Sequence, residues 1–90
     1  DGVSIIGGHV YRKNTNSPFY GVYIFGDHQS RQIWGLTEEN RTLIKIMKIG
    51  MAPQKIVSFT KSENGDLYLV GYEGTIYQLD FEQSRFSFRP

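Results

Sequence analysis

Residues 22–36 read VYIFGDHQSRQIWGL, and residues 67–79 read LYLVGYEGTIYQL. Each stretch has an apolar run, a polar turn and a second apolar run. The first apolar runs are offset by 45 positions and the second by 43. A short strand-like segment precedes each copy, Ser4–Ile6 in one case and Ile56–Ser58 in the other. A period of about 40–45 residues with four strands per unit is typical of a propeller blade.

The composition is that of a β-protein. The 90 residues include ten Gly, six Tyr and six Phe, and aromatic residues favour strands. Seven strand-like runs are separated by turn-forming clusters. They are Val3–Tyr11, Gly21–Asp27, Gln32–Thr37, Leu43–Ile49, Ile56–Thr60, Asp66–Tyr72 and Thr75–Phe81. A helix competes only over Thr42–Met51, but alternating residues there fit a single helix face poorly, and we expect an outer strand.

The apolar runs VYIF and LYLV present apolar side chains to both sides of a strand, so both faces of each sheet must be covered. A two-layer sandwich would instead alternate apolar and polar residues. We therefore expect an all-β chain that forms about two four-stranded antiparallel blades of a β-propeller. Residues 1–51 form one blade, and residues 52–90 form the next. The second blade has three clear strands, and its outer strand is missing or supplied by the tail.

Two blades are fewer than the four to eight that closed propellers need, and open edges and apolar faces favour aggregation. We therefore expect a fragment of a longer protein, or else an assembling subunit, whose partners are the remaining blades or further copies of itself. The net charge is +1 with no basic stripe, which argues against a nucleic-acid partner. No apolar run approaches the ~20 residues that span a bilayer, which argues against a membrane partner.

Four motifs follow one another in an order and spacing that together are fairly specific. They are GGHVYR, GVYIFGD, IWGL and, near the end, SFTKSENGDLYLVGYEGTIYQL. Together they resemble the C-terminal end of the glucose/sorbosone dehydrogenase family, over residues 4–80. That family comprises six-bladed propellers typified by soluble sugar dehydrogenases that use pyrroloquinoline quinone (PQQ). The resemblance implies that the chain holds the last two blades, with the final outer strand supplied by the N-terminus of the parent. It also implies a periplasmic or extracellular parent.

In catalytic members of that family, PQQ lies over the axial channel, calcium polarises it and cationic side chains hold it. Their catalytic His lies in an early blade, so we expect no catalytic residue here and no cofactor bound by this chain alone. Their Lys in the turn after the second strand aligns with Gln29. Their arginine pair aligns with residues 52–55, where Lys55 is the single cation. Arg31 or Lys55 could replace these cations only through a shift in register.

The Asp27-His28 step allows two interpretations. As a functional pair it would supply an acid and a base near the channel mouth. As a turn, Asp27 would accept bonds from nearby backbone N–H groups, and neighbouring residues on a strand point to opposite faces. Members of the family usually carry an aromatic residue where His28 stands, which suggests packing. We favour the turn.

His9 lies on the expected innermost strand, whose side chains can reach the axial channel. His9, together with Tyr11 and Arg12 at the end of this stretch, is therefore the better candidate for a functional role. The resemblance places Tyr at the position of His9 in many members, which favours channel lining or stacking over proton transfer. No spacing typical of a metal site is present. Asn40-Arg41-Thr42 is an N-glycosylation sequon in a hairpin turn, with meaning only for a protein exported from a eukaryotic cell.

Two functions remain open. In the first, the parent is a PQQ-dependent sugar or aldose oxidoreductase, with a sugar ligand, and these blades form part of its wall. In the second, the parent is a non-catalytic propeller that binds a protein or glycan partner. The family match favours the first function, and the absence of the matched cations favours the second.

Overall fold

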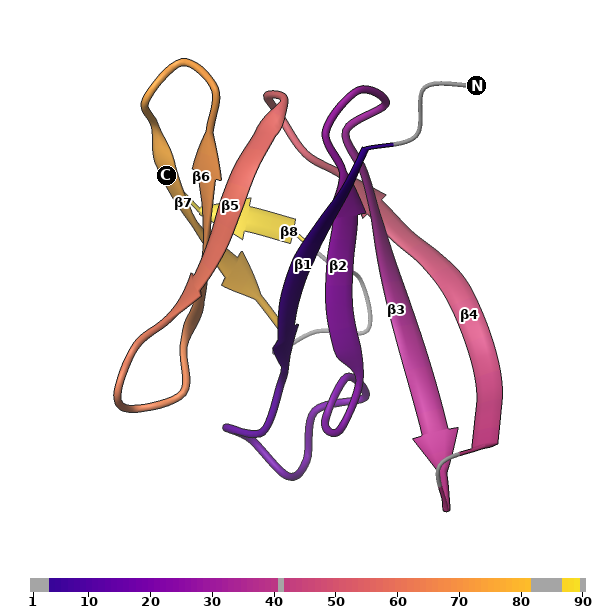
Figure 1. Cartoon of the computed structure of the whole chain (residues 1–90). Coiled ribbons are helices and arrows are strands. Elements are labelled where there is room, and N and C mark those ends of the chain that lie inside the picture. Colours follow the sequence, from indigo (N-terminus) through magenta and orange to yellow (C-terminus); the bar gives the residue numbers. More distant parts are fainter. Residues whose placement is uncertain (1–3, 41, 82–86, 90) are drawn as a thin grey trace.

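The computed structural model describes residues 4–40, 42–81 and 87–89, and every regular element among them is a strand (Figure 1). The strands form two four-stranded antiparallel sheets. The prediction of an all-β chain is therefore confirmed, including a strand rather than a helix over Thr42–Met51. None of the described residues belongs to a helix that could cross a membrane.

Each sheet is a simple meander, in which consecutive strands are neighbours. The first sheet contains β1 (Ile5–Val10), β2 (Tyr23–Asp27), β3 (Gln32–Glu39) and β4 (Thr42–Met51). The second sheet contains β5 (Ile56–Lys61), β6 (Leu67–Gly71), β7 (Ile76–Asp80) and β8 (Ser87–Arg89). The short strand β8 comes from the C-terminal tail and pairs with β7, with Phe88 opposite Leu79.

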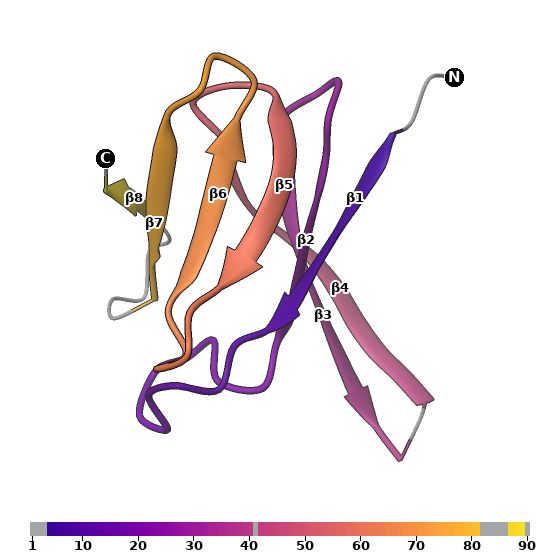
Figure 2. The same cartoon turned by 60° about the vertical axis from the view of Figure 1, so that its left-hand side comes forward.

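The first strands of the two sheets, β1 and β5, lie side by side and run in the same direction (Figures 1 and 2). From this shared edge the sheets diverge, so that β4 and β8 lie on opposite sides of the molecule (Figure 2). The connections therefore gather at two ends of the molecule. Residues 28–31, 52–55 and 72–75 lie at one end, which we call the linker end. Residues 11–22 and the β5–β6 turn lie at the opposite end, which we call the loop end.

We take Ile33 and Ile76, which the sequence repeat aligns, as occupying the same place in the two sheets, and the strand registers then give the counterparts on the neighbouring strands. Gly26 pairs with Ile33 in the first sheet, and Val70 pairs with Ile76 in the second. Ile33 and Ile76 are 43 positions apart, whereas their partners Gly26 and Val70 are 44 positions apart. The similar sequences VYIFG and LYLVG are offset by 45, one residue more. A shift of one residue turns a side chain to the other face of a sheet. Residues that the offset of 45 aligns therefore lie on opposite faces of their respective sheets.

We call the side of each sheet that carries Gly26, or its counterpart Val70, the front face. The front face of the first sheet lies on the second sheet, since a β-carbon on Gly26 would come 2.5 Å from Cδ1 of Ile56 and 3.4 Å from Cζ of Phe59. Phe59 pairs with Leu69, so the surface that it shares with Leu69 is the back face of the second sheet. Front therefore meets back, and both sheets are turned the same way.

A single core joins the two sheets and the long β1–β2 loop. At the loop end, the ring of Tyr11 stacks on that of Phe81 with centroids 4.1 Å apart, and Phe19 meets Phe81 edge-on at 5.7 Å. The hydroxyl of Ser17 donates to the carbonyl of Phe81 and accepts from the backbone N–H of Phe19. The fully or nearly fully buried apolar side chains are Tyr11, Val22, Ile24, Ile33, Ala52, Ile56, Leu67, Leu69, Leu79 and Phe81.

Candidate functional site

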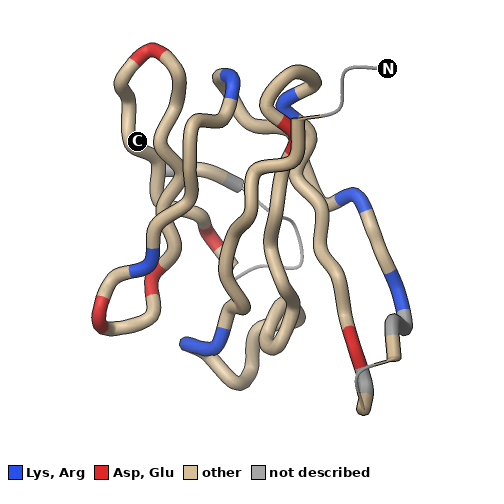
Figure 3. The backbone as a smooth tube through the Cα atoms, in the orientation of Figure 1, with Lys and Arg blue, Asp and Glu red and all other residues tan. Residues whose placement is uncertain are grey.

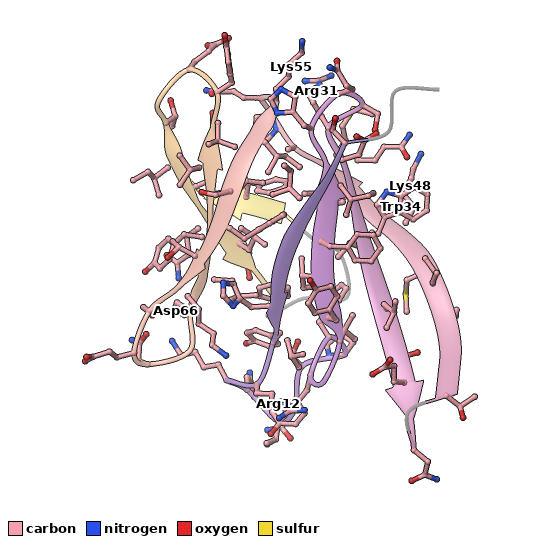
Figure 4. All side chains as sticks on the ribbon, viewed as in Figure 1. Arg12, Arg31, Trp34, Lys48, Lys55 and Asp66 are labelled. Atoms are coloured by element: carbon pink, nitrogen blue, oxygen red, sulfur yellow. The ribbon has the colours of Figure 1, made fainter. Side chains whose placement is uncertain are left out.

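The linker end brings together four of the residues that the sequence singled out: His28, Gln29, Arg31 and Lys55. Three connections meet there, namely the β2–β3 turn, the β4–β5 linker and the β6–β7 turn. Figure 4 shows Arg31 and Lys55 at this end, with Arg12 at the opposite end. The resemblance had marked the first two connections for cofactor contacts, and they are adjacent in space.

Asp27 organises the β2–β3 turn. Its Oδ2 accepts from the hydroxyl of Ser30 at 2.7 Å, and its Oδ1 accepts from the backbone N–H groups of Ser4 and Gln29 at 3.0 and 3.3 Å. The hydrogen bond from the Ser30 hydroxyl, followed by that from the Ser4 backbone, lowers the pKa of the Asp27 carboxyl below its usual value. The carboxylate is thus held as an anionic acceptor within the turn, which is the role of a turn-forming residue.

His28 connects the two sheets. Its Nδ1 lies 2.6 Å from the carbonyl oxygen of Ile56, and because a carbonyl can only accept, we assign the proton to Nδ1. In the neutral ring, Nε2 is then the acceptor. The ring meets that of Tyr72 edge-on at 6.2 Å, and Tyr72 is 69% exposed. This arrangement fixes the orientation of the imidazole and presents it beside an exposed aromatic ring.

Arg31 lies along the β4–β5 linker. Its backbone is left-handed, with φ of 64°, and its carbonyl accepts from the N–H of Ala52 at 2.7 Å. The guanidinium donates from Nη1 to the carbonyl of Pro53 at 3.2 Å and lies 3.5 Å from Sδ of Met51. Arg31 therefore ties the turn to the linker. Gln29 and Lys55 are exposed beside it.

Sequence reasoning missed the role of Gln54. Its Oε1 accepts from the backbone N–H of Glu73 at 2.9 Å, and its Nε2 donates to the hydroxyl of Tyr77 at 2.9 Å. The same side chain fills the space above Gly71, where a β-carbon would collide with it. Gln54 thus joins the linker to the β6–β7 turn, and nothing in the residue type or spacing distinguishes it from a solvated linker residue.

The remaining three candidates lie away from the linker end. Tyr11 is only 2% exposed and belongs to the core. Arg12 is exposed at the loop end (Figure 4). His9 is half-buried on β1 opposite Ile24. The structure therefore divides the candidates into a group of four at the linker end and a separate group of three on β1 and at the loop end.

The back face of the first sheet carries an open hollow of about 440 Å³. Phe25 on β2 and Trp34 on β3 form a directly opposed cross-strand pair there, and Trp34 in turn lies opposite Lys48 on β4 (Figure 4). The residues that line the hollow are Ile5, Phe25, Asp27, Ser30, Gln32, Trp34 and Ile46. This apolar surface is the counterpart of the Leu69 and Tyr77 surface on the second sheet, where Leu69 is fully buried.

Among the described residues, no group of three or more His, Asp or Glu side chains could hold a metal ion. Lys and Arg are spread over both ends and along β4 rather than gathered on one face (Figure 3). Comparison of the chain with protein-family models, with curated proteins and with solved structures finds no match.

Proposed function

We propose that this chain forms two adjacent blades of a β-propeller similar to the C-terminal end of a glucose/sorbosone dehydrogenase. The proposal rests on one observation: the front face of the first sheet lies on the back face of the second, while β1 and β5 run side by side in the same direction. Rotation about an axis along these inner strands relates sheets in this way. In a sandwich whose two sheets are related by a two-fold axis, the same face of each sheet would instead point inward.

Rotation also explains the two apolar faces that remain open. On the back face of the first sheet, Phe25 and Trp34 line the hollow. On the front face of the second sheet, Ile76 is 56% exposed although its counterpart Ile33 is fully buried. In a propeller, the neighbouring blades cover both surfaces. Larger apolar patches on soluble proteins commonly mark such contacts.

We further propose that the parent protein is a periplasmic or extracellular propeller that binds a protein or glycan partner at the linker end. The side chains of His28 and Arg31 are engaged with the carbonyls of Ile56 and Pro53, which holds the connections together. The exposed Lys55 and Tyr72 are available at the surface. A tyrosine with an exposed ring can stack on a sugar or pack in a protein interface.

A PQQ-dependent sugar oxidoreductase is the second candidate for the parent. The observation that favours it is the contact between the two connections that the family uses for cofactor cations, with Nη1 of Arg31 3.2 Å from the Pro53 carbonyl. Arg31 and Lys55 would supply positive charge to the carboxylates of PQQ there, with calcium bound to the cofactor. The neutral Gln29 in place of a lysine weakens this candidate.

The blade proposal is tested by the mass of the chain in solution. We expect light scattering to give a mass above 10.4 kDa, because the open faces of the two sheets associate. Ile76→Lys should lower the average mass, whereas Asn16→Lys, which adds the same charge in the exposed β1–β2 loop, should not. A clean monomer at high concentration would contradict the proposal.

Two sets of assays on the complete propeller distinguish the two candidate functions. Equilibrium dialysis with PQQ and calcium, followed by dye reduction with aldoses, tests the oxidoreductase. A glycan array and a pull-down test the binding protein, with Tyr72→Ala as the variant and Tyr20→Ala, another exposed tyrosine at the opposite end, as the matched control. Quinone-dependent turnover would overturn the non-catalytic proposal, and absence of PQQ binding would remove the oxidoreductase.

A further inference from the structure

The tip of the β3–β4 hairpin carries a sequence motif that neither candidate function uses. Asn40 is followed by Arg41 and Thr42, which is the Asn-X-Thr acceptor pattern for N-linked glycans. The chain has three other asparagines, and none of them has Ser or Thr two positions later. They are Asn14, Asn16 and Asn64. The motif therefore marks one position in the chain.

The structure places this position at an exposed hairpin tip, away from the rest of the described chain. The hairpin tip extends beyond the body of the molecule (Figures 1 and 2). Asn40 and Thr42 are both exposed, and no described residue hydrogen-bonds the side-chain amide of Asn40. By contrast, the side-chain Oδ1 of Asn14 accepts from the N–H of Asn16, and that of Asn64 meets the hydroxyl of Ser62.

The backbone at Asn40 offers a competing reason for an asparagine. Its φ is 53°, in the left-handed region that Asn adopts more readily than most residues. A turn of this kind accounts for Asn40 alone. It does not require Thr42, which is exposed and opens β4 opposite Glu39. The Thr42 hydroxyl is required by a glycan acceptor motif but not by a left-handed turn at Asn40.

We propose that Asn40 is an N-glycosylation site when the protein passes through a eukaryotic secretory pathway. In the modification, the host transferase moves a glycan from a lipid diphosphate donor to the Asn40 amide nitrogen. A bond forms between this nitrogen and C1 of the first sugar while the bond from C1 to the diphosphate oxygen breaks, the amide loses one proton, and the lipid diphosphate is the leaving group. The site lies at the opposite end of the first sheet from residues 28–31, so a glycan there leaves the linker end open. The inference holds for either candidate function of the parent.

The test is secretion of the chain from cultured mammalian cells behind a cleavable signal peptide, followed by peptide-N-glycosidase digestion. We expect one digestible glycan on the wild-type chain, seen as a single shift in gel mobility and confirmed by mass spectrometry. Asn40→Gln and Thr42→Ala should each abolish the shift. Thr42→Ser, which keeps a hydroxyl, and Asn16→Gln, in another exposed loop, should retain it.

The cell lysate is analysed together with the medium, because the glycan is attached before export is complete. A variant that folds poorly is therefore still scored for its glycan. A wild-type chain without a digestible glycan in both fractions would overturn the proposal. So would a shift that persists in Asn40→Gln, since it would place the modification elsewhere.

Discussion

The contact between the sheets at Gly26 gives the sharpest test of the fold. A β-carbon at this position would lie 2.5 Å from Cδ1 of Ile56 and 3.1 Å from the carbonyl oxygen of Gln32. Ile56 is fully buried, so its side chain has little room to move aside. Gly26→Ala should therefore force apart two surfaces that belong to different sheets.

The expected magnitude combines two opposing effects. Replacing Gly by Ala in a strand would by itself stabilise the chain by roughly 0.5–1 kcal/mol, through the conformational entropy of the unfolded state. Overpacking a core costs about 1–3 kcal/mol. We expect Gly26→Ala to lower the free energy of unfolding by about 1–2 kcal/mol. Ile56→Val removes the Cδ1 atom in question and costs about 0.5–1.5 kcal/mol by itself.

In the double variant the new methyl group occupies space that Cδ1 has left. Its loss of stability should therefore be smaller than the sum of the two single losses, by about 1 kcal/mol. Urea unfolding at one fixed protein concentration, followed by the fluorescence of Trp34, measures all three variants. The remaining contact with Gln32 should keep the rescue incomplete.

Gly7 supplies the matched control. A β-carbon there would have the hydroxyl of Tyr23 as its nearest neighbour, at an ordinary distance of 3.4 Å. Gly7→Ala and Ile56→Val should therefore be additive within ~0.5 kcal/mol. The reasoning is refuted if the Gly26→Ala and Ile56→Val losses also add, or if Gly26→Ala stabilises the chain.

Three further variants test local features. Gly8→Ala should cost more than about 3 kcal/mol, since its new methyl group collides with the backbone carbonyl of Ile24; a native circular dichroism spectrum with an unchanged melting midpoint would contradict this. Asp27→Asn should lower the urea midpoint at pH 7. Because the folded pKa of Asp27 is depressed, its contribution is present above the unfolded pKa of ~4 and is lost as the pH falls through the folded pKa; a gap to wild type that stays constant down to pH 2 would count against the hydrogen bonds of its carboxylate. Ser17→Ala removes two buried hydrogen bonds and should cost about 1–3 kcal/mol, and an unchanged midpoint would speak against them.

The strands could be located from sequence because apolar runs and turn residues alternate so regularly. All seven expected runs agree with strands β1 to β7 to within two residues at each end, although Val3 of the first run lies outside the described residues. The segment Thr42–Met51 is the clearest success, since its composition alone allowed a helix. The alternation of its residues argued against a single helix face, and the strands expected around it decided in favour of a strand.

The register of the repeat could not be read in the same way. VYIFG and LYLVG match best at an offset of 45, but the turn after β2 is one residue longer between paired positions than the turn after β6. Hydrogen-bond pairing, rather than residue similarity, sets which side chains face the neighbouring sheet. Sequence similarity therefore aligned Ile24 with Leu69, although these residues lie on opposite faces of their sheets.

The candidate site was located only in part. Charge and motif drew attention to His28 and Arg31, and the structure brings both to the linker end. It also shows that each bonds a backbone carbonyl from a segment more than 20 residues away, a partner that no local pattern reveals. Tyr11 looked like a channel residue because it follows GGHV, but its ring stacks on Phe81, 70 positions later in the chain.

The stack of Tyr11 on Phe81 has a consequence for how the chain is made. A ribosome delivers Tyr11 and Phe19 before it delivers Phe81, so these rings lack the cover of the Phe81 ring while residues 20–80 are being synthesised. The first sheet can pair its strands early, yet the loop end closes only after the seventh strand has emerged. A nascent chain should thus expose the apolar surface of Tyr11 and Phe19 until Phe81 has emerged from the ribosome. Chaperones would be needed during that interval.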